Sequence, residues 1–237
     1  MNETLELFQQ ALMDCIMALP VTMFLTVVSV LCGLCIAVPF AVLYSKKHTL
    51  ASKLINGFVY FFTGTPLLVQ LYIFYYGIPS LSFVNELMRE PGFEFLKGSY
   101  IYVLAALTLN TAAYSTVIFS GAIRNTDRGE IEAAYAYGMS KAQAMRRVIL
   151  PSSLRRALPA YSNEVIMTMH ATALASTVTI VEITGAASFF NSTYYEPFIA
   201  YAAAAVLYLT LNTILVVAFR QVEKRYLAHL KTRLSSS

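Results

Sequence analysis

Two ionisable side chains stand out because of where they lie. Glu164 directly precedes the apolar segment Val165 to Val181, and His170 lies within it. Ionisable groups in such segments are costly to desolvate and usually have a function. A Glu164 carboxylate can accept hydrogen bonds from an ammonium or guanidinium group, and His170 can donate one to a carboxylate. The alternatives are an ion pair between Glu164 and an arginine of the preceding loop, and a His170 packed against a backbone or hydroxyl group.

The spacing of this pair limits how one ligand can be held. Six residues of straight helix separate two side chains by ~9 Å along the axis and by about 120° around it. Glu164 and His170 are therefore not expected on one face. Either the helix is irregular near Thr168 to Thr172, or the two side chains contact opposite ends of an elongated ligand.

Asn110 and Tyr114 form a second polar pair. They lie one helical turn apart on one face of the apolar segment Gly98 to Ile123. Polar side chains in such a segment either hydrogen-bond to neighbouring helices or line a path for a polar molecule. The sequence leaves both possibilities open.

No group of residues predicts covalent chemistry. The chain has no Ser/His/Asp constellation, no paired-histidine metal motif and no Gly-Lys pair, so a phosphate-binding G-x-x-x-x-G-K-[ST] loop is absent. Cys32 and Cys35 form a Cys-x-x-Cys without histidine or acidic partners in an apolar run, which favours a packing role over redox or metal chemistry. We therefore expect no catalytic residue, no metal site and no cofactor on this chain.

These polar residues belong to a chain that is 57% hydrophobic and 13% charged, a composition typical of a protein embedded in lipid. Five charge-poor windows are each near or above the ~20 residues that a helix needs to cross a bilayer. We expect an all-α membrane protein, a single domain over residues 1–237. Its five transmembrane helices are expected in the windows Cys15 to Ser45, Leu54 to Asn85, Gly98 to Ile123, Val165 to Val181 and Pro197 to Phe219.

The segments between these windows differ sharply in charge. Fifteen of the seventeen Lys and Arg residues fall in the loop Lys46 to Lys53, the loop Arg124 to Arg156 and the tail from Arg220. Lys and Arg near span ends resist translocation, so these segments are expected in the cytoplasm. The N terminus is then outside and the C terminus inside. This topology explains the net charge of +4, which is no signal for nucleic acid. The first span, which no positive region precedes, is expected to be retained.

The second window must contain a break. Its 32 uncharged residues would extend ~48 Å as one helix, longer than the ~30 Å bilayer core. Pro66 lacks a backbone N–H and disfavours helix at Thr65, while Gly64 loosens the preceding turn, so we expect the break at Thr63-Gly64-Thr65-Pro66. It is either an ordinary proline kink or a break that contacts a ligand.

The cytoplasmic segment of about residues 125–157 is expected to form two short helices. Asp127 and Gly138 mark the ends of the first. Ser140 and Gln143 form a capping box for the second, which we expect Pro151 to end. Each helix has an apolar side that either packs on the protein's own spans or docks another protein.

The same segment carries the pattern Glu132-Ala133-Ala134, three residues, Gly138, and nine residues before Val148-Ile149-Leu150-Pro151. This resembles the cytoplasmic "EAA" loop in the permease subunits of bacterial ATP-binding-cassette importers. From about Gly64 onward the chain is similar in particular to the permeases for polar and basic amino acids, of the histidine and arginine kind. The other matching stretches are Gly64 to Gln70, Leu109 to Tyr114, Gly121 to Arg124 and Tyr161 to Ile166.

The resemblance implies a permease in the bacterial inner membrane that imports basic amino acids and has no enzymatic activity of its own. ATP and Mg would bind to a partner ATPase dimer, whose cleft would receive the loop. A second permease subunit, identical or related, and an extracytoplasmic amino-acid-binding protein are the other implied partners. The coupling residues would be Glu132, Ala133, Ala134, Gly138, Leu150 and Pro151.

For the substrate site, the resemblance implies an acid at Glu164, a basic residue at His170 and an asparagine at Asn110, and we add Tyr114 on the same helix face. Three positions depart from the pattern of similar permeases. Thr63 replaces a common arginine, Val117 replaces a frequent acidic residue, and His170 replaces a lysine, as in the histidine-type permeases.

The main alternative is a proton-coupled secondary amino-acid transporter, in which Glu164 and His170 would relay protons instead of holding substrate. A membrane enzyme is a weaker alternative, because the polar residues form no catalytic constellation.

Overall fold

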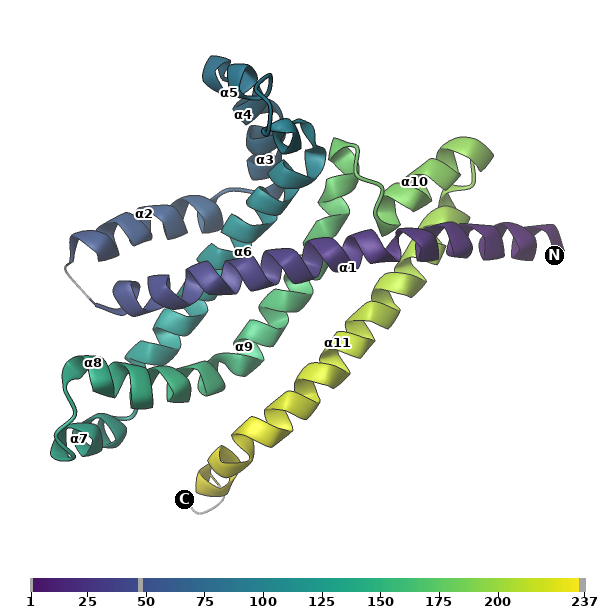
Figure 1. Ribbon diagram of the computed structural model, residues 1–237. Helices are drawn as coiled ribbons and strands as arrows, with labels where there is room; N and C mark the ends of the chain where they lie inside the picture. Colours follow the sequence, from purple (N-terminus) through teal and green to yellow (C-terminus); the bar gives the residue numbers. More distant parts are fainter. Residues whose placement is uncertain (1, 47–48, 235–237) are drawn as a thin grey trace.

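The computed structural model describes residues 2–46 and 49–234, so Lys47 of the first loop predicted to be cytoplasmic and the ends of the predicted domain lie outside the described residues. The described residues form helices and connecting segments without a strand (Figure 1). The fold is therefore all-helical, as the composition indicated. The two termini lie far apart, at different ends of the molecule.

Within the described residues, three helices are long and apolar enough to span a membrane: α1 (Asn2–Ser45), α6 (Ser99–Arg124) and α11 (Pro197–Leu234). Helix α1 packs closely against α6, and Gly33 lies at a point of close approach. A Cβ on Gly33 would lie 2.6 Å from Cγ2 of Thr111. This close approach needs a residue without a side chain, and it fixes the position of the polar face of α6.

Two bent pairs of helices are the further candidate spans. The helix Leu50–Gly64 and the helical segment Leu67–Ser80 meet at 105°, and Lys141–Val178 meets Ile183–Tyr194 at 44°. The described residues thus hold three to five candidate spans by length and composition. The window Val165 to Val181 is not a separate helix, because most of it continues the long helical run from Lys141, which ends at Val178.

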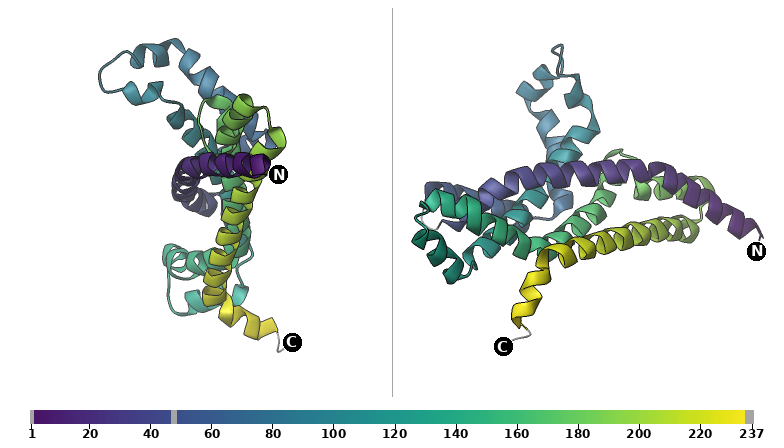
Figure 2. Two further views of the ribbon diagram at one scale, coloured as in Figure 1. Left: turned by 90° about the vertical axis from the view of Figure 1, so that its right-hand side faces the viewer. Right: turned by 60° about the horizontal axis from the view of Figure 1, so that its bottom comes forward.

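The first bend lies at the predicted break. Helix α2 (Leu50–Gly64) ends before Thr65, which is extended at φ −118° and ψ 146°, and α3 (Leu67–Tyr72) begins after Pro66. The chain then continues through a π-helical turn η1 (Ile73–Gly77), α4 (Ile78–Ser80), α5 (Ser82–Leu87) and the short 3-10 helix η2 (Glu94–Lys97). Figure 2 shows this part of the chain projecting from the other helices.

The first predicted short helix after α6 and the start of the second are confirmed. Asp127 caps α7 (Arg128–Ala136) by accepting from the Gly129 N–H, and Gly138 follows it at φ +74°. Ser140 and Gln143 form the predicted capping box of α8 (Lys141–Ala144). We call residues 125–144 the elbow.

The prediction that Pro151 ends the second short helix is wrong. Helix α8 continues through the π turn η3 (Met145–Ile149) into α9 (Leu150–Ala171) and the 3-10 segment η4 (Thr172–Val178). In the π turn the Leu150 N–H donates to the carbonyl of Met145, five residues earlier. The return from π to α geometry puts Pro151 in the first turn of α9, where a missing N–H is tolerated.

The apolar sides of the elbow helices pack on the protein's own helices. Ala134, Ala144 and Ile149 share a buried cluster with Ala37 and Ala41 of α1, and this cluster continues onto Phe119 and Ile123 of α6. Ile131, Met139 and Met145 are packed against it. The opposite side of the elbow is exposed, including Tyr137 at 85%.

Candidate functional site

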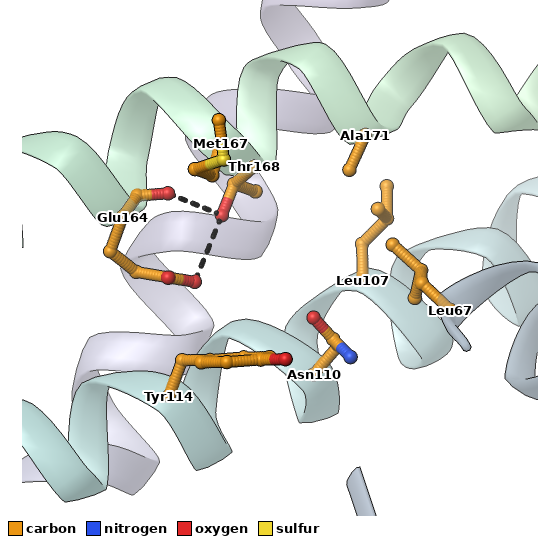
Figure 3. A pocket seen from close by; sticks show the side chains of 8 residues that line it. All are labelled: Leu67, Leu107, Asn110, Tyr114, Glu164, Met167, Thr168 and Ala171. Carbon is orange, nitrogen blue, oxygen red and sulfur yellow. Dashed lines mark hydrogen bonds between the residues drawn. The ribbon is translucent and has the colours of Figure 1, made fainter. Parts of the chain in front are cut away.

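A cavity of about 250 Å³ lies between α6 and α9, next to the first residue of α3 (Figure 3). We call it the α6–α9 cavity. Three of the four residues predicted for the substrate site, Asn110, Tyr114 and Glu164, line it. Residues far apart in the sequence are therefore brought together, with Asn110 and Tyr114 of α6 facing Glu164 of α9 across the cavity. The remaining lining residues are Leu67, Leu107, Met167, Thr168 and Ala171.

Glu164 is the charged group of this cavity. Its side chain is buried, with the residue 9% exposed, and Thr168 Oγ1 donates to its backbone carbonyl at 3.0 Å and to its carboxylate at 3.5 Å. The alternative ion pair with an arginine is not found. Among the side chains described for residues 3–46 and 49–226, Arg156 of α9 forms an ion pair with Glu130 of α7 and not with Glu164. A buried carboxylate without a cation is favourably placed to bind one.

Asn110 and Tyr114 both hydrogen-bond to the break and line the cavity. The Asn110 side-chain amide donates to the Phe62 carbonyl at 3.1 Å and to Gln70 Oε1 at 3.0 Å. The Tyr114 hydroxyl donates to the Thr63 carbonyl at 3.4 Å. These two side chains therefore both hydrogen-bond to a neighbouring segment and line a cavity, the two roles that the sequence left open.

His170 lies elsewhere. It is exposed on α9, does not line the α6–α9 cavity, and has its ring centroid 6.4 Å from that of Tyr208 on α11. Helix α9 is α-helical up to Ala171, and 3-10 geometry begins only at Thr172. The regular helix therefore turns His170 away from Glu164, as the 120° offset predicted.

Gln70 and Glu182 are two buried polar residues that the sequence did not single out. Gln70 is completely buried at the break and bonds to Asn110. Glu182 is completely buried at the start of α10 (Ile183–Tyr194), where its carboxylate accepts from the Gly185 N–H at 2.8 Å and the Tyr208 hydroxyl at 2.6 Å. The sequence feature that could have identified Gln70 is its position, a side-chain amide four residues after the helix-breaking Pro66.

The predicted coupling residues lie on and beside the elbow. Glu132, Ala133 and Gly138 are exposed, whereas Ala134 is buried against α1 and α6. Leu150 and Pro151 are half-buried at the start of α9. The accessible residues thus leave the outer side of α7 open for a partner.

A surface hollow of about 430 Å³ adjoins the elbow. Ala142, Gln143, Arg146 and Arg147 line it. The two arginines are exposed and give this hollow a positive charge.

The sequence relatives cover nearly the whole chain. A histidine/lysine/arginine/ornithine transport system permease protein, HisM, of Salmonella typhimurium is 45% identical over 215 residues, which is 90% of each chain. The HisM protein of Escherichia coli is 46% identical over 89% of this chain and 88% of its own. The nopaline transport system permease protein NocM of Agrobacterium fabrum is 37% identical over 93% of this chain and 90% of its own.

Solved structures show the same fold. An amino acid ABC transporter with histidines has a TM-score of 0.75 at 28% identity, over 95% of this chain and 96% of that one. The MetNI methionine ABC transporter has a TM-score of 0.71 at 17% identity, over 95% and 99% of the two chains.

The model of the protein family described as "Binding-protein-dependent transport system inner membrane component" matches residues 29–228. This range contains α6, α9 and the elbow between them. The length of this match and the identity to the relatives agree with the multiple apolar helices. The chain belongs to the family of binding-protein-dependent transport system inner membrane components, the permease subunits of ABC transporters, and is a multi-pass protein of the inner membrane.

Proposed function

We propose that this chain is the permease subunit of an ATP-driven importer of basic amino acids. The observation that carries the proposal is the Glu164 carboxylate, buried in the α6–α9 cavity without a cationic partner among the described side chains. The 45% identity to a permease for histidine, lysine, arginine and ornithine supports the same substrate class. A cationic side chain or α-ammonium group would supply the missing charge.

The proposed site divides the ligand between two surfaces. Glu164, Asn110 and Tyr114 would hold the cationic group inside the cavity. His170, six residues further along α9 and exposed, would meet the α-carboxylate of an elongated ligand, ~9 Å away along the helix axis.

The proposed topology has five spans in a single domain over residues 1–237, with the N terminus outside and the C terminus in the cytoplasm. Each bent pair then counts as one span. The elbow lies on the cytoplasmic side of this arrangement, where Glu132, Ala133, Ala134, Gly138, Leu150 and Pro151 would form the coupling region.

The proposed partners divide the work of transport. A dimeric ATPase would bind ATP and Mg and dock on the elbow, beside the positive hollow at Arg146 and Arg147. A second permease, identical or related, would complete the pathway, and an extracytoplasmic binding protein would deliver the amino acid. This chain would then perform no covalent chemistry.

The test is uptake by proteoliposomes that contain this chain with its partner subunits. Glu164→Gln keeps the shape and removes the charge, so uptake of arginine and lysine should fall by about tenfold or more, because a hydrogen bond to a charged group contributes roughly 1.5–3 kcal/mol. Glutamine uptake should change much less. Glu196→Gln, at an exposed glutamate outside the cavity, is the matched control. Equal loss for cationic and neutral amino acids would refute charge recognition at Glu164.

The proton-coupled alternative is tested in the same vesicles. Proteoliposomes without the ATPase receive a proton gradient, and those with it receive ATP. Uptake that follows the gradient and needs no ATPase would replace the importer by a secondary transporter.

A further inference from the structure

The break at Pro66 leaves a backbone carbonyl without its helical partner. In a continuous α-helix the Phe62 carbonyl would accept from the N–H of residue 66, but proline has none. Two side-chain amides bond to it instead. Gln70 Nε2 donates to the Phe62 carbonyl at 2.8 Å, and Asn110 Nδ2 donates at 3.1 Å.

This arrangement fixes the orientation of the Gln70 amide. Its Nε2 also donates to the Thr65 carbonyl at 3.0 Å and to Thr65 Oγ1 at 2.8 Å. Carbonyl oxygens only accept hydrogen bonds, so the nitrogen of Gln70 must face the break. Its oxygen then points to α6, where it accepts from Asn110 Nδ2 at 3.0 Å. Gln70 is completely buried, and water cannot replace these contacts.

Gln70 and the Phe62 carbonyl together set the orientation of the Asn110 amide. The Asn110 NH2 group is held between two acceptors, Gln70 Oε1 and the Phe62 carbonyl. Its Oδ1 therefore lies on the opposite side. Figure 3 shows this oxygen turned toward the cavity, with the nitrogen turned away from it.

The other polar groups of the α6–α9 cavity have also used their donors. Tyr114 donates its hydroxyl proton to the Thr63 carbonyl, and Thr168 donates its own to the Glu164 carbonyl. Each hydroxyl oxygen keeps lone pairs but has no second proton. With the Glu164 carboxylate and Asn110 Oδ1, the cavity presents acceptors only.

We infer that Gln70 is a positioning residue for substrate selection: it holds Asn110 with its carbonyl oxygen toward the cavity, so that the cavity accepts a donor-bearing cation. This inference rests on the proposed function and extends it to a residue that does not line the cavity. The selected ligand group is an ammonium or guanidinium group, because each donates several hydrogen bonds and accepts none.

The test replaces Gln70 by methionine, which is similar in length and volume but cannot hold the Asn110 amide. Asn110 then keeps only the Phe62 carbonyl as an acceptor, so one hydrogen bond instead of two opposes the turn that would bring its NH2 group toward the cavity and a bound cation. In proteoliposomes with all partner subunits, KM for arginine should rise by about tenfold, since a contact to a charged group is lost. KM for glutamine should change little, so the ratio of kcat/KM values for arginine and glutamine should fall.

A double-mutant cycle separates positioning from a general structural role. If Gln70 acts through Asn110, Gln70→Met should lower this arginine-to-glutamine ratio no further in an Asn110→Ala background. The control is Thr65→Val, which removes a Gln70 contact at the break but leaves the Gln70–Asn110 hydrogen bond. It should keep the ratio even if it slows transport. Gln70→Leu is the second variant should Gln70→Met fail to assemble with the ATPase.

The outcomes separate the inference from the proposed function. An unchanged ratio in Gln70→Met, or additive losses in the cycle, would refute the role of Gln70 while leaving the importer intact. A wild-type protein without preference for arginine over glutamine would refute the proposed substrate class and the inference with it.

Discussion

The hydroxyl of Tyr208 on α11 donates a 2.6 Å hydrogen bond to the Glu182 carboxylate at the start of α10. The same carboxylate caps α10 through the Gly185 N–H, and Thr184 Oγ1 lies 3.1 Å from the Tyr208 hydroxyl. This contact joins two helices that also share the buried cluster formed with α1. Glu182 is completely buried, so each of its donors matters for stability.

Tyr208→Phe should therefore destabilise the protein. It removes one donor from a buried carboxylate, which costs on the order of 1–3 kcal/mol. The apparent melting temperature of the detergent-purified permease should fall, and Glu182→Leu should lower it further because the cap of α10 is also lost. Tyr201→Phe, at an exposed tyrosine of the same helix, should have little effect. Equal melting temperatures for the two tyrosine variants would contradict the importance of this contact.

Gly33 and Gly57 offer a matched pair of glycine substitutions within helices. A Cβ on Gly33 would meet Thr111 Cγ2 at 2.6 Å, whereas a Cβ on Gly57 would meet nothing within 4 Å. Gly33→Ala should cost about 1–3 kcal/mol by overpacking the α1–α6 contact. Gly57→Ala should be neutral or stabilising, because alanine favours helix. Denaturation of the purified variants should rank them in this order, and the reverse order would argue against the close approach of α1 and α6.

Gly138 tests the backbone of the elbow rather than its side chains. Its φ of +74° is left-handed, and there is open space around it. Gly138→Val should strain this turn by about 1–2 kcal/mol or more, while Gly138→Asn should be tolerated because asparagine adopts left-handed geometry readily. We expect co-purification with the ATPase to be lost in the valine variant and retained in the asparagine variant. Loss in both variants would mean that the partner needs the bare glycine surface.

Arg156 connects α9 to the elbow. It pairs with Glu130 of α7 at 3.4 Å, and it donates to Thr126 Oγ1 at 3.0 Å and to Ser153 Oγ at 3.1 Å. The pair is partly exposed, so its loss should change stability only slightly. Arg156→Ala should instead loosen the elbow and reduce amino-acid uptake per ATP hydrolysed. Arg155→Ala, at the exposed neighbour, is the control. An unchanged uptake-to-hydrolysis ratio in Arg156→Ala would speak against this connection.

The sequence predicts well those features that depend on neighbouring residues. The break at Pro66 and the caps at Asp127 and Ser140 follow from local backbone chemistry, and the structure has all of them. The offset between Glu164 and His170 follows from helix geometry alone. Pro151 was misjudged because the π turn before it depends on packing of the elbow, which the local sequence does not show.

The residues missed are those whose partners lie far away in the chain. Gln70 bonds to Asn110, 40 positions later, and the Glu182 carboxylate bonds to Tyr208, 26 positions later. A buried amide or carboxylate in an apolar run indicates that a partner exists. It does not say which one, because that depends on how the helices pack.

The helical run from Lys141 to Val178 has a mechanical consequence. The last residues of the elbow, from Lys141, and Glu164 belong to one continuous helical run, and ~27 Å of helix separate Arg146 from Glu164. A tilt of about 10° at the elbow end would displace Glu164 and Thr168 by ~5 Å at that length. Asn110 and Tyr114 belong to a different helix, α6. The same tilt would therefore separate the two groups of side chains that are proposed to hydrogen-bond to the amino acid. Ligand release would then require only that Glu164 and Thr168 move away from Asn110 and Tyr114.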